Sequence, residues 1–116
     1  MARVFVVEEP MYRDPTTGVV KPKFDLRLAA AYGDVQILLD DTRALNTGPM
    51  IHTLRRKLAK YTSDDYILPV GNPAAMSLAV AVAAVNNRGW VNILLWHRET
   101  RKYVCVKANV YGKRAA

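Results

Sequence analysis

The stretch YILPVGNPAAMSLAVAVAAVNNRGWVNILLW, residues 66–96, decides the predicted fold. It begins with an apolar run at 66–70, turns at Gly71-Asn72-Pro73, and continues through an Ala- and Val-rich segment into the β-forming run 90–96. Asn is a preferred helix N-cap, and Pro fits the first helical turn. The stretch therefore predicts a strand, a helix and a second strand, and a right-handed crossover would place both strands in one sheet.

The residues before this unit predict a further strand of the same sheet and a further helix. Val35–Leu39 reads as a short apolar strand, and Gly48 with Pro49 is a start signal for a second helix. Apolar side chains then recur at helical spacing and define a buried face, namely Met50, Ile51, Leu54, Leu58 and Tyr61. Two main helices are therefore expected to cover the sheet.

Both ends of the chain are predicted to form hairpins. Arg3–Glu9 and Val19–Phe24 read as strands on either side of a turn at 14–18, which gives an N-terminal hairpin within residues 1–24. A short helix over Leu26–Tyr32, capped by Asp25, should follow.

At the other end, Tyr103–Val110 should pair antiparallel with 90–96, and residues 112–116 should form a frayed basic tail. The predicted fold is a single compact α/β (or α+β) domain over residues 1–116. It has a mixed sheet of five or six strands, two main helices, one short helix and terminal β-hairpins.

Composition limits the class of protein. The 116 residues are 51% apolar, so one domain can bury a core without metals or disulfides. Seventeen Lys and Arg against ten Asp and Glu give a formal net charge of +7. A surplus of this size favours nucleic acid or an acidic protein as partner, although it can also serve solubility alone. No signal peptide or membrane span is recognisable, so a cytoplasmic protein is expected.

The basic side chains carry the strongest functional signal. Arg55, Arg56 and Lys60 lie on the helix predicted to begin at Gly48. Arg98, Arg101 and Lys102 lie in the last hairpin turn. Trp96 and Tyr103 flank that turn, and cations next to aromatic rings suit phosphate contact together with base stacking. The alternative is a solvated helix face and a charged hairpin tip that protects edge strands.

The corner at Gly71 and Asn72 is a second candidate site. A strand that leads into a helix N-terminus is the generic geometry for binding anions. However, one glycine matches neither the dinucleotide nor the phosphate-loop pattern, and Pro73 removes one N–H donor. A structural cap explains these residues better than a phosphate site does.

Other chemistry finds little support. The acid pairs Glu8-Glu9, Asp40-Asp41 and Asp64-Asp65 are expected to be solvated turn residues unless two pairs converge on a metal. Cys105, the only cysteine, should act as a small apolar strand residue. No catalytic residue, metal ligand set or cofactor is therefore predicted.

The chain resembles small uncharacterised proteins of tailed bacteriophages and prophages. The resemblance rests on residues 64–73, the Ala-rich segment after them, 91–98, and Phe5–Met11. It implies a compact viral protein in a bacterial cytoplasm, and such proteins often bind host factors or nucleic acid.

Three functions remain open at this point. The preferred hypothesis is a non-enzymatic basic module that binds nucleic acid or an acidic host protein. The alternatives are a small nucleotide- or phosphate-binding enzyme using the Gly71-Asn72 corner, and a structural or homo-oligomeric viral protein that extends its sheet through an edge strand.

Overall fold

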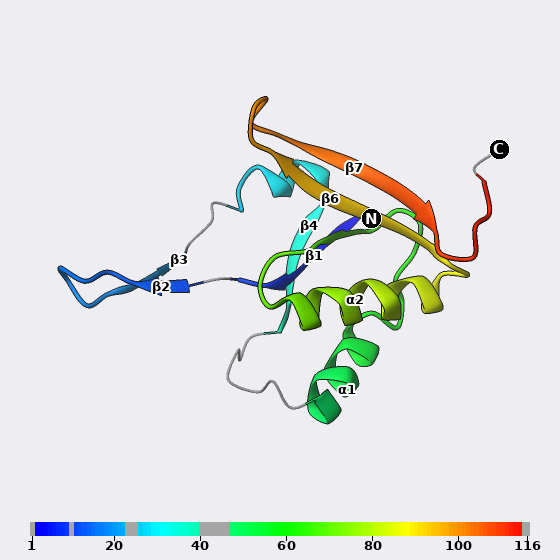
Figure 1. Cartoon of the computed structure of the whole chain (residues 1–116), viewed down its shortest axis with the longest axis horizontal. Coiled ribbons are helices and arrows are strands. Elements are labelled where there is room, and N and C mark those ends of the chain that lie inside the picture. The colour runs from blue at the N-terminus through cyan, green and yellow to red at the C-terminus, as the bar shows by residue number, and fades with distance from the viewer. Residues whose placement is uncertain (1, 10, 23–25, 40–46, 115–116) are drawn as a thin grey trace.

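The computed structural model, shown in Figure 1, describes residues 2–9, 11–22, 26–39 and 47–114. Its main sheet has five strands in the order β4-β1-β5-β6-β7. The strands are β1 (Arg3–Glu8), β4 (Asp34–Leu39), β5 (Tyr66–Leu68), β6 (Trp90–His97) and β7 (Lys102–Asn109). All neighbours pair in parallel except β6 and β7, which form an antiparallel hairpin. The predicted mixed α/β sheet is confirmed.

Helices cover the two faces of this sheet unequally. One face packs against α1 (Thr47–Lys57) and α2 (Pro73–Asn86), and the other lies against the short 3₁₀ helix η1 (Ala29–Tyr32). Large side chains with less than 2% exposure fill the layer under the helices, including Phe5, Leu38, Leu54, Leu58 and Ile67. Full burial of one such side chain contributes about 1.5–3 kcal/mol, so this layer stabilises most of the fold.

The N-terminal hairpin exists, but its strands differ from those predicted. It consists of β2 (Met11–Arg13) and β3 (Val20–Pro22), which form a separate two-stranded sheet (Figure 1). The β1 run is buried on both faces and lies between β4 and β5, which suits a central parallel strand better than a hairpin strand. The predicted turn is confirmed, because Asp14 accepts the N–H of Thr16 at 2.8 Å and its C=O accepts that of Gly18 at 2.8 Å.

Two of the predicted helices also differ from expectation in type or in their first residue. The predicted helix over Leu26–Tyr32 is only the 3₁₀ turn of η1, and its predicted cap, Asp25, lies outside the described residues. The predicted turn at Asp40-Asp41 lies outside them too. Helix α1 begins at Thr47, one residue before the predicted cap Gly48.

Helix α2 is buried on one side only. Its Ala75, Ala79 and Ala83 are buried, whereas Val85 on the outer side is 69% exposed. Its sequence is apolar nearly all round, which is typical of a buried helix that lies close against a sheet, so the exposure of its outer side is a difference from expectation. The difference arises because α2 is an outer layer with only the sheet and α1 to pack against, and its small residues let it approach the sheet closely.

Candidate functional site

The Gly71-Asn72 corner is closed by the chain's own side chains. Asn72 Oδ1 accepts the N–H groups of Ala74 and Ala75 at 2.9 and 3.4 Å, which confirms the predicted N-cap. Glu8, only 4% exposed, accepts the Asn72 N–H through Oε1 at 2.7 Å. Gly71 has a φ of +112°, and a Cβ there would lie 2.6 Å from the Glu8 Cβ. A carboxylate therefore already occupies the position where the strand end meets the N-terminus of α2.

Glu8 was expected to be a solvated turn residue, and so was Asp65, but both are buried. Asp65 is fully buried. Its Oδ2 accepts from the Arg3 guanidinium at 2.8 Å and from the Thr62 N–H at 2.9 Å, and its Oδ1 accepts the Arg3 backbone N–H at 3.0 Å. Burial raises the pKa of this carboxyl, but the hydrogen bonds from Arg3 and Thr62 and the charge of Arg3 outweigh it, so the pKa is lowered.

The carbonyl of Asp65 extends this network across the sheet. It accepts from the Tyr61 hydroxyl at 3.1 Å and from Asn92 Nδ2 at 2.9 Å, and the same Tyr61 oxygen accepts the Asn92 N–H at 3.0 Å. Burial raises the pKa of Tyr61 to about 12. Asp65 thus joins β1, the segment that follows α1, and β6, and its role is structural.

Among the described residues, the acid pairs Glu8-Glu9 and Asp64-Asp65 make separate contacts, and Asp40-Asp41 lies outside this part of the chain. Within the described residues, no three His, Cys, Asp or Glu side chains are arranged to hold a metal ion. Glu8 is engaged at α2 and Asp65 at Arg3, while Asp64 is exposed.

Cys105 was predicted to be a small apolar residue of a strand. It lies in β7 as expected but is exposed, and partial burial raises the pKa of its thiol more than Lys107 lowers it. This shift is opposite in direction to that of an activated thiol.

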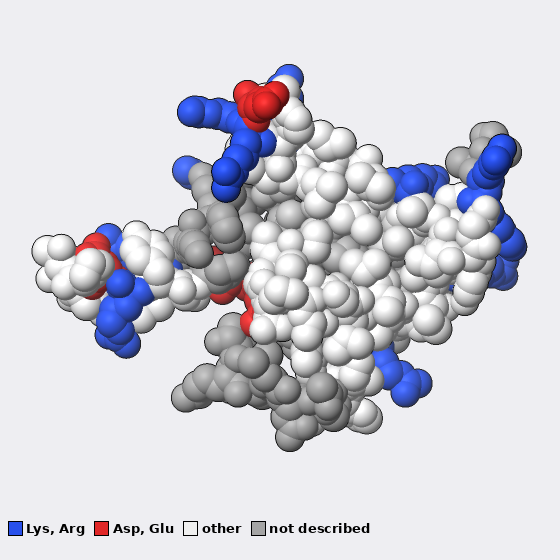
Figure 2. Space-filling view, in the orientation of Figure 1, with Lys and Arg blue, Asp and Glu red and all other residues white. Residues whose placement is uncertain are grey.

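The β6–β7 hairpin tip gathers the predicted basic and aromatic side chains. Arg98, Arg101 and Lys102 are all exposed at the turn, and Glu99 is the one acid among them. Trp96 is 44% exposed and packs edge-on against Tyr103, with ring centroids 5.1 Å apart. Figure 2 shows the blue cations of this tip projecting beyond the white body of the molecule.

The backbone holds this tip in one conformation. Arg101 has a φ of +54°, in the left-handed region, and its N–H bonds to the His97 carbonyl at 2.8 Å. The His97 ring closes the turn through Nδ1, which lies 2.9 Å from the Thr100 hydroxyl and accepts the Thr100 N–H at 3.3 Å. Beneath the stem, the Tyr32 hydroxyl donates to the Tyr103 carbonyl at 3.2 Å. The cations therefore lie on a hairpin whose turn and stem are held by hydrogen bonds.

The cations on and just after α1, called the α1 cations, form a separate surface, and Lys60 lies beyond the helix end at Lys57 although it was predicted on the helix. Arg55, Arg56 and Lys60 are exposed, and the two arginines line an open hollow of about 430 Å³ together with His52, Ala59 and Asn86. Figure 1 shows α1 and the β6–β7 tip at opposite ends of the molecule. The structure thus brings Trp96 together with Arg98, Arg101 and Lys102, but not with the α1 cations.

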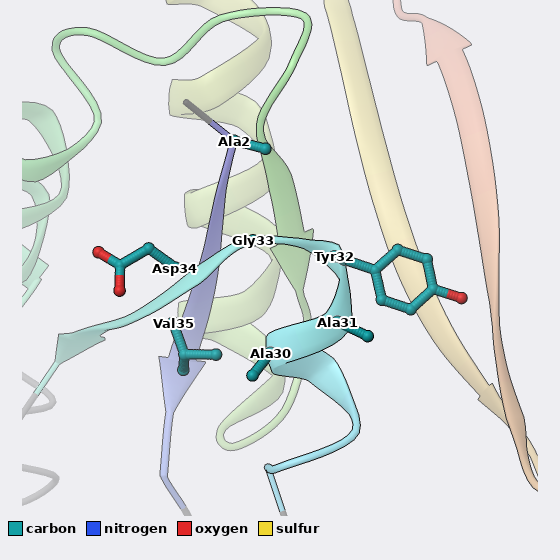
Figure 3. A pocket seen from close by; sticks show the side chains of 7 residues that line it. All are labelled: Ala2, Ala30, Ala31, Tyr32, Gly33, Asp34 and Val35. Atoms are coloured by element: carbon teal, nitrogen blue, oxygen red, sulfur yellow. The ribbon is translucent and has the colours of Figure 1, made fainter.

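A further hollow of about 670 Å³ lies where η1 leads into β4. In Figure 3, Tyr32 points away toward β6, and Asp34 points to the opposite side. The remaining lining is Ala2, Ala30, Ala31, Gly33 and Val35, which offer no side-chain group for catalysis or polar binding.

These features define a small basic α/β protein built on a mixed five-stranded sheet, with none of its described helices both long and apolar enough to cross a membrane. The chain belongs to the family described as Phage Pam3 gp32-like protein, whose sequence profile matches residues 2–110. The match confirms the resemblance to small phage proteins. No curated protein and no solved structure matches the chain.

Proposed function

We propose that this phage-family protein is a non-enzymatic binding module that engages single-stranded nucleic acid through the tip of its β6–β7 hairpin. The observation that carries the proposal is the exposed Trp96 ring, packed against the half-buried Tyr103 and close to the exposed cations Arg98, Arg101 and Lys102. Cations can neutralise phosphates, and an exposed ring can stack on a base, so this combination suits an unpaired strand.

The geometry of the tip supports this function because its basic and aromatic side chains are carried on a backbone that is already ordered before binding. The turn is fixed by its backbone hydrogen bond to His97, and the stem is braced by Tyr32. A preorganised surface loses less conformational entropy when it binds. The α1 cations are too distant to share the same short segment, so we assign them at most a second contact with a longer strand.

The alternative at the Gly71-Asn72 corner is less favoured. The Glu8 carboxylate would repel a phosphate there, and it already accepts the Asn72 N–H. An acidic host protein remains the competing partner for the hairpin, and the experiment below separates the two.

The test compares two variants that each remove three positive charges. One is Arg98→Gln/Arg101→Asn/Lys102→Gln, with Asn chosen because it tolerates the left-handed backbone at Arg101. The control is Arg55→Gln/Arg56→Gln/Lys60→Gln, which removes the α1 cations. Affinity for a short labelled single strand, measured by fluorescence anisotropy, should fall much more in the hairpin variant.

A third variant, Trp96→Ala, tests stacking. It should weaken binding by about 1–3 kcal/mol without changing the salt dependence, because no phosphate contact is lost. Equal losses in the two charge variants would refute the hairpin site. Binding to polyglutamate but not to any oligonucleotide would assign the tip to an acidic protein instead.

A further inference from the structure

Strand β7 is an edge of the main sheet, and its central residues 103–106, between Lys102 and Lys107, are uncharged. The opposite edge strand, β4, has its Ile37 carbonyl bonded to Lys57 Nζ at 3.2 Å, and a charged side chain of this kind blunts an edge. By contrast, β7 is eight residues long, contains no proline, and pairs with β6 without a bulge from Trp90↔Asn109 to His97↔Lys102. Figure 1 shows it as the outermost strand.

The register identifies which backbone groups of β7 face outward. The Val110 N–H bonds to the Gly89 carbonyl at 2.8 Å, and hydrogen-bonded pairs alternate along an antiparallel ladder. The even-numbered residues of β7 therefore bond to β6, and the odd-numbered ones face outward.

Two of the outward residues already use their carbonyls. That of Tyr103 accepts the Tyr32 hydroxyl at 3.2 Å, and that of Asn109 accepts the Gly112 N–H at 3.0 Å. For Cys105 and Lys107, no hydrogen bond of the outward N–H or C=O is found within the described chain.

The side chains around this segment are apolar on the helix-covered face of the sheet. Leu95, Val104 and Val106 are 46%, 46% and 41% exposed, beyond the part of the sheet that α2 covers. Lys107 points to the other face, where its amine lies 5.6 Å from the centroid of the Trp90 ring. The free edge thus presents two sets of backbone donors and acceptors on either side of an uncharged valine.

We propose that β7 pairs antiparallel with β7 of a second copy of this chain, with the two-fold axis at Val106. A two-fold axis normal to the sheet keeps each side chain on its face, so opposed residues must both be odd-numbered or both even-numbered. With Val106 opposite the partner's Val106, Cys105 exchanges two hydrogen bonds with the partner's Lys107. Lys107 exchanges two more with the partner's Cys105, so the outward backbone groups of these two residues are satisfied and no two lysines are directly opposed.

In the competing register, with Cys105 on the axis, Tyr103 would pair with the partner's Lys107, through a carbonyl that also accepts the Tyr32 hydroxyl. The proposed register keeps Tyr103 out of the four central hydrogen bonds. The proposed pairing instead joins the Leu95–Val104–Val106 surfaces of the two copies into one apolar strip across a ten-stranded sheet.

This inference does not depend on nucleic-acid binding, and salt distinguishes the two. One strand pair is a small interface, so the dimer should form in the micromolar range. Each copy carries +7, so added salt should strengthen self-association, whereas it weakens binding to a polyanion.

The test is sedimentation equilibrium of nucleic-acid-free protein at high salt. The mass should rise from 13.0 kDa toward twice that value with concentration. Val106→Lys should abolish the increase, while Val19→Lys, at a position 52% exposed outside the main sheet, should not. A monomer at every concentration, or a dimer that Val106→Lys leaves intact, would overturn the proposal and leave the edge to a strand of another protein.

Oxidative cross-linking then tests the register. Opposed residues of a non-hydrogen-bonded pair lie about 4.5 Å apart at Cα, within reach of a disulfide. Cys105→Ser/Val106→Cys should therefore cross-link readily. Cys105→Ser/Val104→Cys should not, because the cysteine of one copy then lies four residues along the strand from the cysteine of the other. Cross-linking of the wild-type Cys105 as efficient as that of the Val106→Cys variant would overturn the proposed axis.

Discussion

Replacement of Asp65 by Asn should destabilise the protein by about 3 kcal/mol. Removing one member of a buried ion pair typically costs 3–5 kcal/mol. The lower value applies because the Arg3 side chain is 27% exposed and can regain water, whereas Asp65 is fully buried. The Asn amide would also direct N–H groups at donors that now reach the carboxylate, from Arg3 and Thr62.

Urea unfolding of Asp65→Asn at pH 7 measures this loss, with Asp64→Asn as the control. Asp64 is adjacent and exposed, so its substitution should change the free energy of unfolding by about 0.5 kcal/mol or less. A loss below about 1 kcal/mol at Asp65, or equal losses at both positions, would refute the assigned role of the buried pair.

The pH dependence of the same variants gives an independent check. The pKa of Asp65 is lowered in the folded state, so its stabilisation is present above the unfolded value of about 3.9 and is lost as the pH falls through the folded value. The difference between wild type and Asp65→Asn should therefore shrink on acidification. A difference that stays constant from neutral to strongly acidic pH would contradict the lowered pKa.

Three further predictions concern the backbone and the thiol. Gly71→Ala should cost about 2 kcal/mol or more in urea unfolding, because of its positive φ and the contact with Glu8, while Gly18→Ala, with open space around its Cβ, should cost only about 1–2 kcal/mol. An equal cost at both positions would mean that the Glu8 side chain can move away from a Cβ at position 71 with little loss of stability. Asn72→Ala should cost about 1 kcal/mol through loss of the helix cap, and Asn72→Asp should recover most of it; failure of that rescue would argue against capping. Alkylation of Cys105 should show a midpoint above that of the thiol in urea, since its pKa is raised, and a lower midpoint would reveal an activating group.

The elements that could be predicted from the sequence are those with strong local signals. Asn72 and Pro73 define the start of α2, and the β-branched and aromatic run from Trp90 defines β6, so both appear where expected. The N-terminal pairing was wrong because hairpin turn signals give no information on long-range parallel partners. Only the burial of Val4–Val7 on both faces distinguishes a central strand, and that continuous run of apolar residues was the available signal.

The candidate site was predictable only in its local part. Trp96, Arg98, Arg101 and Lys102 are brought together because they share one hairpin, whereas the relative position of α1 depends on the whole sheet. The engagement of Asp65 by Arg3 could not be foreseen, since 62 residues separate the two and an Asp-Asp pair after a helix equally suits a solvated turn.

The central claim is that the hairpin tip binds nucleic acid through phosphates and stacking. The most direct measurement is fluorescence anisotropy of labelled single- and double-stranded oligonucleotides titrated with wild-type protein across a series of salt concentrations. The account predicts tighter binding to the single strand and an affinity that falls steeply as salt rises, since each neutralised phosphate contributes about 0.7 to the slope for single strands. No binding at low salt, or binding that salt does not weaken, would contradict it.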